Sequence, residues 1–140
     1  MGGFPAMIHL PDGCRVRGRA LRSPAPADPP DRALYLGRSH RDYRPDWPHE
    51  WLDWPDFRLP SDPPAAIRAV QLLHTHARSG EQVEVACGGG IGRTGTVIAC
   101  LAVLSGVDPR EAVAWTRRHY HRRAVETPWQ RRWVTRFPTP

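Results

Sequence analysis

The sequence contains no lysine, and all 20 of its basic residues are arginine. With 14 acidic residues the formal net charge is +6, and a positive surface favours phosphorylated or otherwise anionic partners by electrostatic steering. The codon bias of a genome explains the absence of lysine equally well, so the charge alone identifies no partner. Because no recognised nucleic-acid-binding module accompanies the charge, we expect no nucleic-acid partner.

Cysteines and long apolar runs are also scarce. The three cysteines (Cys14, Cys87 and Cys100) are an odd number at spacings that fit no metal motif, which predicts a reducing compartment and neither metal nor cofactor. We recognise no signal peptide and no apolar run long enough to span a bilayer. The sequence therefore predicts a cytoplasmic protein without a membrane partner. A reversible disulfide between Cys87 and another cysteine is a hypothesis that rests only on their presence.

Glycine, in contrast, is concentrated directly after Cys87. Residues 83–86 have the pattern of a short strand, and residues 96–104 are apolar all round, like a buried helix. The glycines between them predict a tight strand-to-helix turn, in which the first N–H groups of the helix face a concavity and bind an anion. The residues predicted to hold a phosphate are Gly88, Gly89, Gly90, Ile91, Gly92 and Arg93.

Cys87 and Arg93 add chemistry to this turn. A thiol beside a helix N-terminus and a guanidinium is readily deprotonated, so we expect Cys87 to be a thiolate at neutral pH. Arg93 can hold two oxygens of a tetrahedral phosphate at once. A nucleophile at the base of an anion-binding turn predicts a covalent phospho-cysteine intermediate.

Three other interpretations of this turn are weaker. Residues 90–95 satisfy the dinucleotide-binding pattern G-x-G-x-x-G, but no second strand ending in an acidic residue follows. Residues 87–94 come close to the nucleotide-binding loop pattern, but cysteine replaces its first glycine and arginine replaces its lysine. In addition, no apolar strand ends in an aspartate that would hold magnesium. A simple glycine turn over a buried thiol leaves Arg93 unexplained.

Residues 87–95 carry the pattern C-x5-R-[ST]-G, which resembles the signature of the cysteine-dependent protein tyrosine phosphatases, including the small dual-specificity group. That family usually has a histidine before the cysteine, where this chain has Ala86. The resemblance implies a protein tyrosine phosphatase-like α/β fold, and a role for Thr94 in stabilising the departing thiolate. With the order of expected elements, it predicts one domain over residues 1–140, whose central, mostly parallel sheet is flanked by helices on both faces.

Residues 39–64 are dense in Pro, Trp, Asp and Arg without periodicity, which predicts a long loop of functional importance. Within it, residues 54–57 (Trp-Pro-Asp-Phe) resemble the mobile acid loop of the same phosphatases, whose aspartate is the general acid. The leaving oxygen of a phosphate ester needs a proton, and a carboxylic acid on a closing loop supplies it. Asp56 is therefore the predicted acid, and Asp53 is the alternative.

Residues 126–130 (Glu-Thr-Pro-Trp-Gln) are similar to the family's glutamine loop, which positions the water that hydrolyses the phospho-cysteine. Gln130 matches the second glutamine of that pattern, and Glu126 replaces the first. The same residues also fit an ordinary T-x-x-Q capping box, in which Thr127 begins a helix. Gln130 is thus a candidate for the catalytic site and, equally, for a helix cap.

The remaining predictions concern the scaffold. Edge strands are expected within residues 1–22, a buried strand over residues 33–37, a helix over residues 62–80, and another after a capping box at residues 108–111. His74 is expected at the surface or boundary of its helix.

Together these residues predict a metal-independent phosphomonoester hydrolase, in which Cys87 attacks phosphorus and Arg93 holds the phosphate oxygens. Asp56 is expected to protonate the leaving group and then, as a base, to activate the water of the second step. No residue between Cys87 and Arg93 is basic, which favours a phosphoprotein over a phosphoinositide. We expect phosphotyrosine as the substrate, with phosphoserine and phosphothreonine left open, and an aromatic cleft lined by residues 43–54. Two alternatives are a phosphotyrosine-binding pseudophosphatase, and a phosphatase of a non-protein phosphomonoester such as a phosphoinositide.

Overall fold

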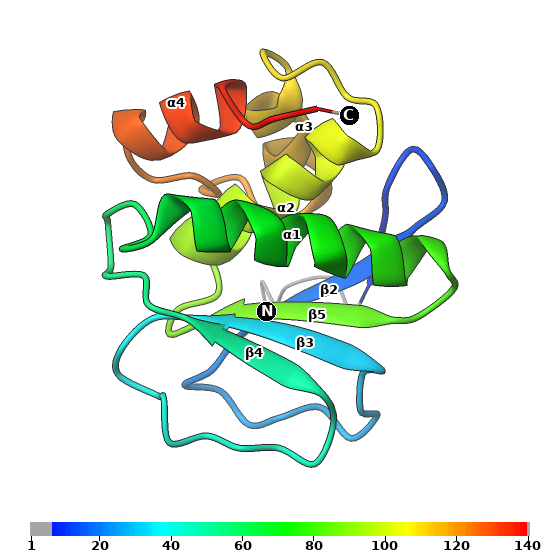
Figure 1. Cartoon of the computed structure of the whole chain (residues 1–140), viewed down its shortest axis with the longest axis vertical. Helices are drawn as coiled ribbons and strands as arrows, with labels where there is room; N and C mark the ends of the chain where they lie inside the picture. The colour runs from blue at the N-terminus through cyan, green and yellow to red at the C-terminus, as the bar shows by residue number, and fades with distance from the viewer. Residues whose placement is uncertain (1–6, 140) are drawn as a thin grey trace.

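A five-stranded sheet forms the framework of the structure, a computed structural model that describes residues 7–139 (Figure 1). The strands lie in the order β1-β2-β5-β3-β4, and all neighbours pair in parallel except β1, which is antiparallel to β2. The strands are β1 (Ile8–His9), β2 (Arg15–Ala20), β3 (Arg32–Leu36), β4 (His49–Leu52) and β5 (Val83–Cys87). The helices are α1 (Pro63–Arg78), α2 (Gly92–Leu104), α3 (Ala112–His119) and α4 (Pro128–Thr135).

The central strand β5 places the candidate nucleophile at one edge of the sheet. All of its residues are buried, and it pairs with β2 on one side and β3 on the other. Val16, Leu34 and Val85 lie in the main core, between the sheet and helices α1 and α2. Because parallel strands end at a common edge, Cys87 at the end of β5 lies where ligands bind in open α/β sheets.

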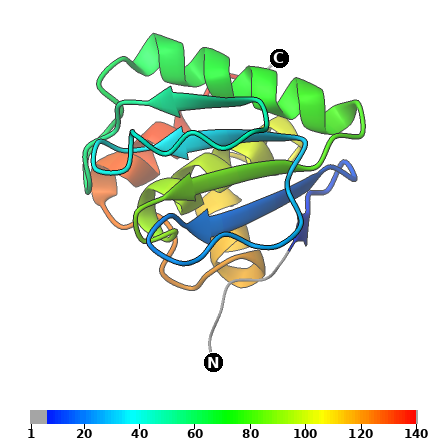
Figure 2. The same cartoon turned by 90° about the horizontal axis from the view of Figure 1, so that it is seen from below.

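The four helices of the described residues all lie on the same face of the sheet (Figures 1 and 2). Helices α1 and α2 contact the strands, whereas α3 and α4 pack on α2. The expectation of helices on both faces is therefore wrong. The second face is covered by the loop residues Leu21, Tyr43 and Trp47 and by Trp51 of β4, which pack on a small cluster that includes Tyr35. These mainly aromatic side chains bury the apolar area that a helix would otherwise cover.

The second face also holds a charge network around Glu84, which is fully buried. Arg17 donates from Nε and Nη2 to Glu84 Oε1, at 3.0 and 2.7 Å, and the Tyr35 hydroxyl donates to Oε2 at 2.8 Å. Arg19 Nε lies 3.0 Å from Oε1. These partners explain how an acidic residue fits a parallel strand that is buried on both faces, because a buried charge is tolerated when it is paired.

Several scaffold predictions are confirmed. The strand predicted over residues 33–37 is β3, and β5 and α2 flank the glycine-rich turn. Helix α1 follows the N-cap Asp62, whose side chain accepts the N–H of Ala65. The chain leaves the end of this helix through Gly80, which has φ +104°. The local capping and glycine signals were therefore sufficient to place this helix.

One scaffold prediction is wrong, and two are confirmed in part. Residues 49–52, expected in a loop, form β4, whose pairing with the distant strand β3 has no local signal. Of the edge strands expected within residues 1–22, β1 is at the edge, but β2 lies between β1 and β5; residues 1–6 lie outside the described residues. The helix expected after residues 108–111 is α3, but no capping box begins it, because Asp108 accepts the N–H of Arg110 in a preceding turn.

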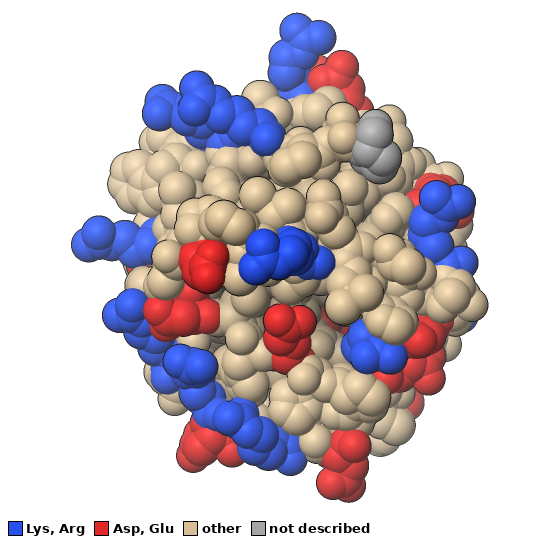
Figure 3. All heavy atoms as spheres, in the orientation of Figure 1, with Lys and Arg blue, Asp and Glu red and all other residues tan. Residues whose placement is uncertain are grey.

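The surface carries charges of both signs. On the face shown in Figure 3, arginine side chains alternate with aspartate and glutamate side chains and form no continuous positive patch.

Among residues 7–139, no helix combines the length and the apolar character that crossing a bilayer requires.

Candidate active site

Residues 88–93, the predicted phosphate-binding loop, follow Cys87 directly and join β5 to α2. The Cys87 side chain is 2 % exposed, and its Sγ accepts the N–H of Gly90 at 3.3 Å. Gly90 has φ +70°, and a Cβ there would lie 2.7 Å from the backbone of Arg19, so only glycine fits this position. Ile91 gives α2 no side-chain cap, which leaves the first N–H groups of the helix for an anion.

Arg93, in the first turn of α2, connects this loop to the predicted acid loop. Its side chain is buried, its Nη1 donates to the carbonyl of Trp54 at 2.9 Å, and its Nε lies 3.5 Å from Asp56 Oδ1. Gly37 makes room for the guanidinium, because a Cβ there would lie 2.9 Å from Nη1 and the residue has φ +135°. Arg93 therefore contacts the segment that carries the predicted acid.

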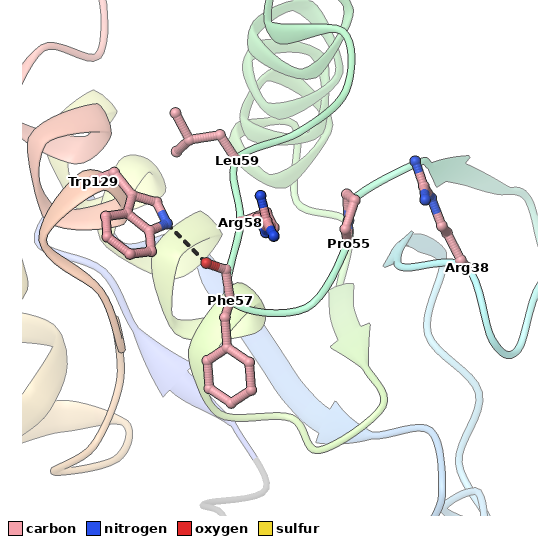
Figure 4. A pocket seen from close by; sticks show the side chains of 6 residues that line it. All are labelled: Arg38, Pro55, Phe57, Arg58, Leu59 and Trp129. Carbon is pink, nitrogen blue, oxygen red and sulfur yellow. Dashed lines mark hydrogen bonds between the residues drawn. The ribbon is translucent and has the colours of Figure 1, made fainter.

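The acid loop, residues 54–59, is held in place by aromatic side chains. Trp54 is fully buried, and its Nε1 donates to the carbonyl of Arg58 at 2.7 Å. Trp129, at the start of α4, donates from Nε1 to the carbonyl of Phe57 at 2.7 Å (Figure 4). Phe57 itself has φ +60°, a left-handed conformation that is uncommon for a bulky side chain. These contacts hold the loop against α4 in a defined turn.

Asp56 and Asp53 have different surroundings. Asp56 lines one cavity with Cys87 and Arg93. Asp53 instead accepts hydrogen bonds from Arg38 at 2.6 and 3.0 Å, and these bonds lower the pKa of Asp53 to about 2. Of the two carboxylates considered from the sequence, only Asp56 faces the cysteine.

The cavity brings most of the predicted site residues together. The predicted residues that line it are Asp56, Cys87, Gly89, Ile91, Gly92 and Arg93. Arg22, Phe57 and Glu126 also line it. None of the three was among the predicted site residues, although Glu126 takes the place of the first glutamine in the glutamine-loop pattern. Thr94 is fully buried in α2, and its hydroxyl makes no hydrogen bond within the described part of the chain. Its catalytic role stays a prediction.

Gln130 is buried in the first turn of α4, where it connects that helix to the acid loop. Its Oε1 accepts the N–H groups of Glu126 and Thr127 at 3.0 and 3.2 Å, and its Nε2 donates to the carbonyl of Arg58 at 3.1 Å. Thr127 Oγ1 accepts the Gln130 N–H at 3.1 Å, which confirms the capping box. Gln130 does not line the cavity, and its role in positioning water stays a prediction.

Two side chains support the phosphate-binding loop, which has Ala86 in place of the family's histidine. The Tyr120 hydroxyl, just after α3, donates to the carbonyl of Gly90, and burial raises the pKa of Tyr120, so the hydroxyl remains a donor. Arg22 Nε donates to the carbonyl of Gly88 at 3.1 Å. No local signal in the sequence connects Tyr120 with Gly90, which lies 30 positions earlier.

Glu126 is the second carboxylate of the cavity. It lies against the start of α2, because a Cβ at Gly92 would collide with Glu126 Oε1. Partial burial and the charge of Asp56 raise the pKa of Glu126, and Arg123 and Arg93 act in the opposite direction. Its acidic side chain and its place in the glutamine-loop pattern were the only features of the sequence that pointed to a place for Glu126 in the site.

A separate cluster lies at the opposite end of β2. Asp12, Cys14 and His74 bring their ligand-type atoms within 4.8 Å of one another, although their spacing in the sequence fits no metal motif. His74 is buried rather than at the surface, and its Nε2 lies 2.8 Å from Asp12 Oδ2. Burial acts to raise the pKa of Asp12, but hydrogen bonds from the Cys14 N–H and His74 outweigh it and lower this pKa to about 2. These hydrogen bonds account for the cluster without an ion.

Residues 55–135 match a phosphatase family described as PTP-SAK, the DSP-PTPase phosphatase domain of Swiss Army Knife proteins. The match covers more than half of the chain. The chain belongs to this family. The matched range contains Asp56, Cys87 and Arg93, so the resemblance seen in the sequence is confirmed.

Curated relatives match part of the chain. An uncharacterised protein of Methanocaldococcus jannaschii, MJECL20, is 40 % identical over 68 residues, which are 49 % of this chain and 45 % of that protein. A candidate tyrosine phosphatase of Invertebrate iridescent virus 3, 067L, is 37 % identical over 70 residues, which are 48 % of this chain and 29 % of that protein. This chain therefore spans less than half the length of these curated relatives.

Solved phosphatase structures share the fold over most of the chain. Tk-PTP in its active form has 26 % sequence identity and a TM-score of 0.70, with 93 % of both chains covered. Kinase associated phosphatase has 17 % identity and a TM-score of 0.74, with 96 % of this chain and 93 % of that chain covered. PTPMT1 in complex with PI(5)P has 18 % identity and a TM-score of 0.60, with 76 % and 75 % covered. At their lower identity, the last two comparisons show a common fold.

Proposed function

We propose that this protein is a phosphatase that hydrolyses phosphotyrosine, and phosphoserine or phosphothreonine where they reach Cys87, through a phospho-cysteine intermediate. The observation that carries the proposal is that Cys87, Arg93 and Asp56 come from β5, α2 and the acid loop and line one cavity. A nucleophile, a phosphate-binding cation and a proton donor are the groups that this reaction needs.

In the first step, Cys87 Sγ attacks phosphorus while the bond to the leaving oxygen breaks. The N–H groups of residues 88–93 and the Arg93 guanidinium stabilise the charge on the phosphate oxygens. Asp56, whose Oδ1 is 3.5 Å from Arg93 Nε, gives its proton to the leaving oxygen. Because Arg93 also donates to the carbonyl of Trp54, binding of phosphate and the position of the acid loop are coupled.

In the second step, water attacks the phospho-cysteine and phosphate leaves as the Cys87 thiolate re-forms. We assign the stabilisation of this thiolate to Thr94, whose fully buried hydroxyl has no hydrogen-bond partner among residues 7–139. The resemblance assigns the positioning of the water to Gln130, although the hydrogen bonds that Gln130 makes here hold the acid loop.

The ring of Phe57 supports phosphotyrosine as the substrate. It is 52 % exposed and lines the cavity, where it can contact a phenyl phosphate. The aromatic residues expected to line this cleft lie elsewhere: Tyr43 and Trp51 pack on Tyr35 at the second face of the sheet. That expectation for residues 43–54 is corrected, and Phe57 is the aromatic residue of the cavity.

A non-protein phosphomonoester is the second candidate substrate, and Arg22 is the observation that favours it. Arg22 lines the cavity beside the phosphate-binding loop and supplies a cation for a second anionic group. PTPMT1, which shares the fold, has been solved with PI(5)P. We rank the phosphoprotein first because none of residues 88–92 is basic. We also propose a cytoplasmic location, which the three free cysteines support.

Hydrolysis of p-nitrophenyl phosphate with EDTA present, for the wild type and for Cys87→Ser, tests the proposed function. We expect turnover in the wild type and none in the variant. Rates with phosphotyrosine peptides, phosphoserine peptides and a phosphoinositide then rank the substrates. Asp56→Asn should lower the rate about 10²–10⁴-fold if Asp56 is the acid.

Two results would overturn the proposed function in different ways. A wild type that binds vanadate without turnover is a pseudophosphatase, which keeps the phosphate-binding loop and lacks the reaction. A wild type with neither turnover nor oxyanion binding contradicts the assignment of the loop itself.

A further inference from the structure

Glu126 and Asp56 are two carboxylates in the same cavity, but they lie on different elements. Asp56 belongs to the acid loop and faces Arg93, with 3.5 Å between Oδ1 and Nε. Glu126 precedes α4 and lies against Gly92, at the end of α2 that borders Cys87. Glu126 also remains exposed to solvent, so water can reach its oxygens. A site with two such carboxylates can divide the two proton transfers of the reaction between them.

Gln130, the residue that the family pattern assigns to the water, makes its hydrogen bonds outside the cavity. Both ends of its amide are used, Oε1 by the N–H groups of residues 126 and 127 and Nε2 by the carbonyl of Arg58. The side chain is fully buried and does not line the cavity. Orienting a water in the cavity would require Gln130 to give up bonds that hold α4 and the acid loop together.

The charges around Glu126 favour proton acceptance. Partial burial and the Asp56 carboxylate raise the pKa of Glu126, and the two cations that face it, Arg93 and Arg123, only partly oppose this change. A carboxylate with a raised pKa is a stronger base toward a bound water. The Asp56 contribution grows after the first step, because Asp56 has then lost its proton and carries a full negative charge.

We propose that Glu126 is the general base that accepts a proton from the water that hydrolyses the phospho-cysteine. This inference rests on the proposed function, and it assigns the two proton transfers to different carboxyl groups: Asp56 is the general acid of the first step, and Glu126 is the general base of the second. In the first step the Cys87 S–P bond forms, the ester P–O bond breaks, and Asp56 gives its proton to the leaving oxygen. In the second step the water oxygen bonds to phosphorus, its proton passes to Glu126, and the S–P electron pair returns to Cys87 Sγ.

The protons transferred in one turnover are all accounted for by Asp56, Glu126 and the attacking water. After the second step Glu126 is neutral and Asp56 is ionised, which is the reverse of the state needed at the start. Transfer of one proton from Glu126 to Asp56, directly or through a cavity water, restores both groups. The net reaction consumes one phosphomonoester and one water and releases one alcohol and one phosphate. No other reactant is needed.

Rapid-mixing kinetics with p-nitrophenyl phosphate separate the two steps. Release of p-nitrophenol reports the first step, and release of inorganic phosphate reports the second. Glu126→Ala should give a burst of about one p-nitrophenol per enzyme, followed by turnover lowered about 10²-fold, as expected for loss of a general base. Mass spectrometry of quenched Glu126→Ala should show the phosphorylated Cys87 peptide. Glu50→Ala, on the exposed edge of β4, is the matched control and should behave as the wild type.

The amide variant distinguishes proton acceptance from orientation of the water. Glu126→Gln retains an oxygen that can accept a hydrogen bond but takes no proton, so we expect it to keep the burst and the slow turnover. Wild-type turnover in Glu126→Gln would overturn the proposal, because orientation alone would then suffice. A first step slowed as much as the second in Glu126→Ala would also overturn it, since that pattern indicates a structural role.

The failure of this proposal is distinguishable from failure of the proposed function. If Glu126 is not the base, the wild type still turns over in a Cys87-dependent manner and Glu126→Ala shows no burst. If the protein is not a cysteine-dependent phosphatase, the wild type itself releases no p-nitrophenol in a Cys87-dependent manner.

Discussion

Replacing Trp129 with phenylalanine removes one hydrogen bond from the acid loop and leaves an aromatic ring in place. The bond runs from Trp129 Nε1 to the carbonyl of Phe57 at 2.7 Å (Figure 4). The indole is 47 % exposed, so the change removes little buried area. Its effect should therefore come mainly from the lost bond, which stabilises the loop in the position that carries Asp56 to Arg93.

The size of the effect follows from the strength of such a bond. A net contribution of about 0.5–1.5 kcal/mol is typical of a neutral hydrogen bond in a protein. Because about 1.36 kcal/mol corresponds to a tenfold change in rate, kcat should fall about 2- to 13-fold if the bond exists only when Asp56 is in place. Steady-state hydrolysis of a phosphotyrosine peptide measures this change. Trp115→Phe is the control, because Trp115 stacks on His119 with ring centroids 4.1 Å apart and does not line the cavity.

A double-mutant cycle decides whether Trp129 acts through the acid. In an Asp56→Asn background the loop has no proton to deliver, so Trp129→Phe should change kcat by less than about twofold. An equal fall in both backgrounds would refute the reasoning, because the indole would then act on the reaction by another route. An unchanged kcat in the wild-type background would show that the bond is equally strong when the loop is away from Arg93.

Three further predictions concern the scaffold. Tyr120→Phe should lower kcat/KM about fivefold. The reason is that the carbonyl of Gly90 loses a hydrogen bond worth about 1 kcal/mol, which holds the phosphate-binding loop in shape. An unchanged kcat/KM and an unchanged vanadate affinity would contradict this prediction. Asp12→Asn should lower the free energy of unfolding at pH 7 by about 1 kcal/mol, after allowance for solvent screening. Because the pKa of Asp12 is lowered from 3.8 to about 2 on folding, its contribution is present above about pH 4 and lost as the pH falls through 2. Urea unfolding of the wild type and of Asp12→Asn at pH 7 and pH 2 checks this prediction. A loss of unfolding free energy that is the same at both pH values would be inconsistent with it. Glu84→Ala should destabilise the fold by about 3–5 kcal/mol, because the buried Arg17 and Arg19 both lose this carboxylate and Arg17 keeps, among the described residues, only the exposed Asp28, 3.5 Å away. Thermal unfolding within a few degrees of wild type would show otherwise.

The parts of the site that lie within one short segment were predictable from the sequence. Cys87 and Arg93 are joined by a glycine-rich turn, so their proximity follows from covalent connection and from the backbone freedom of Gly90. The cap at Asp62 and the capping box at Thr127 were predictable for the same reason, since each depends on a contact within four residues.

Contacts between distant segments had no such signal. β4 forms by pairing with β3, and Tyr120 reaches the phosphate-binding loop from the end of α3. The helices on both faces were a wrong expectation because composition does not say which face a helix covers. Here the aromatic residues of a loop bury the second face of the sheet.

The proposed chemistry of this protein follows from its sequence alone: a cysteine and an arginine in one strand-to-helix turn predict a phosphate site, because covalent connection brings them together. Only the tertiary structure decided which carboxylates share the cavity. Asp56 and Glu126 lie far apart along the chain, and packing of the acid loop against α4 brings both beside Cys87, while Asp53 turns to Arg38. The physical reason is that burial and hydrogen bonding between distant segments, such as the acid loop and α4, exist only once folding has brought those segments into contact.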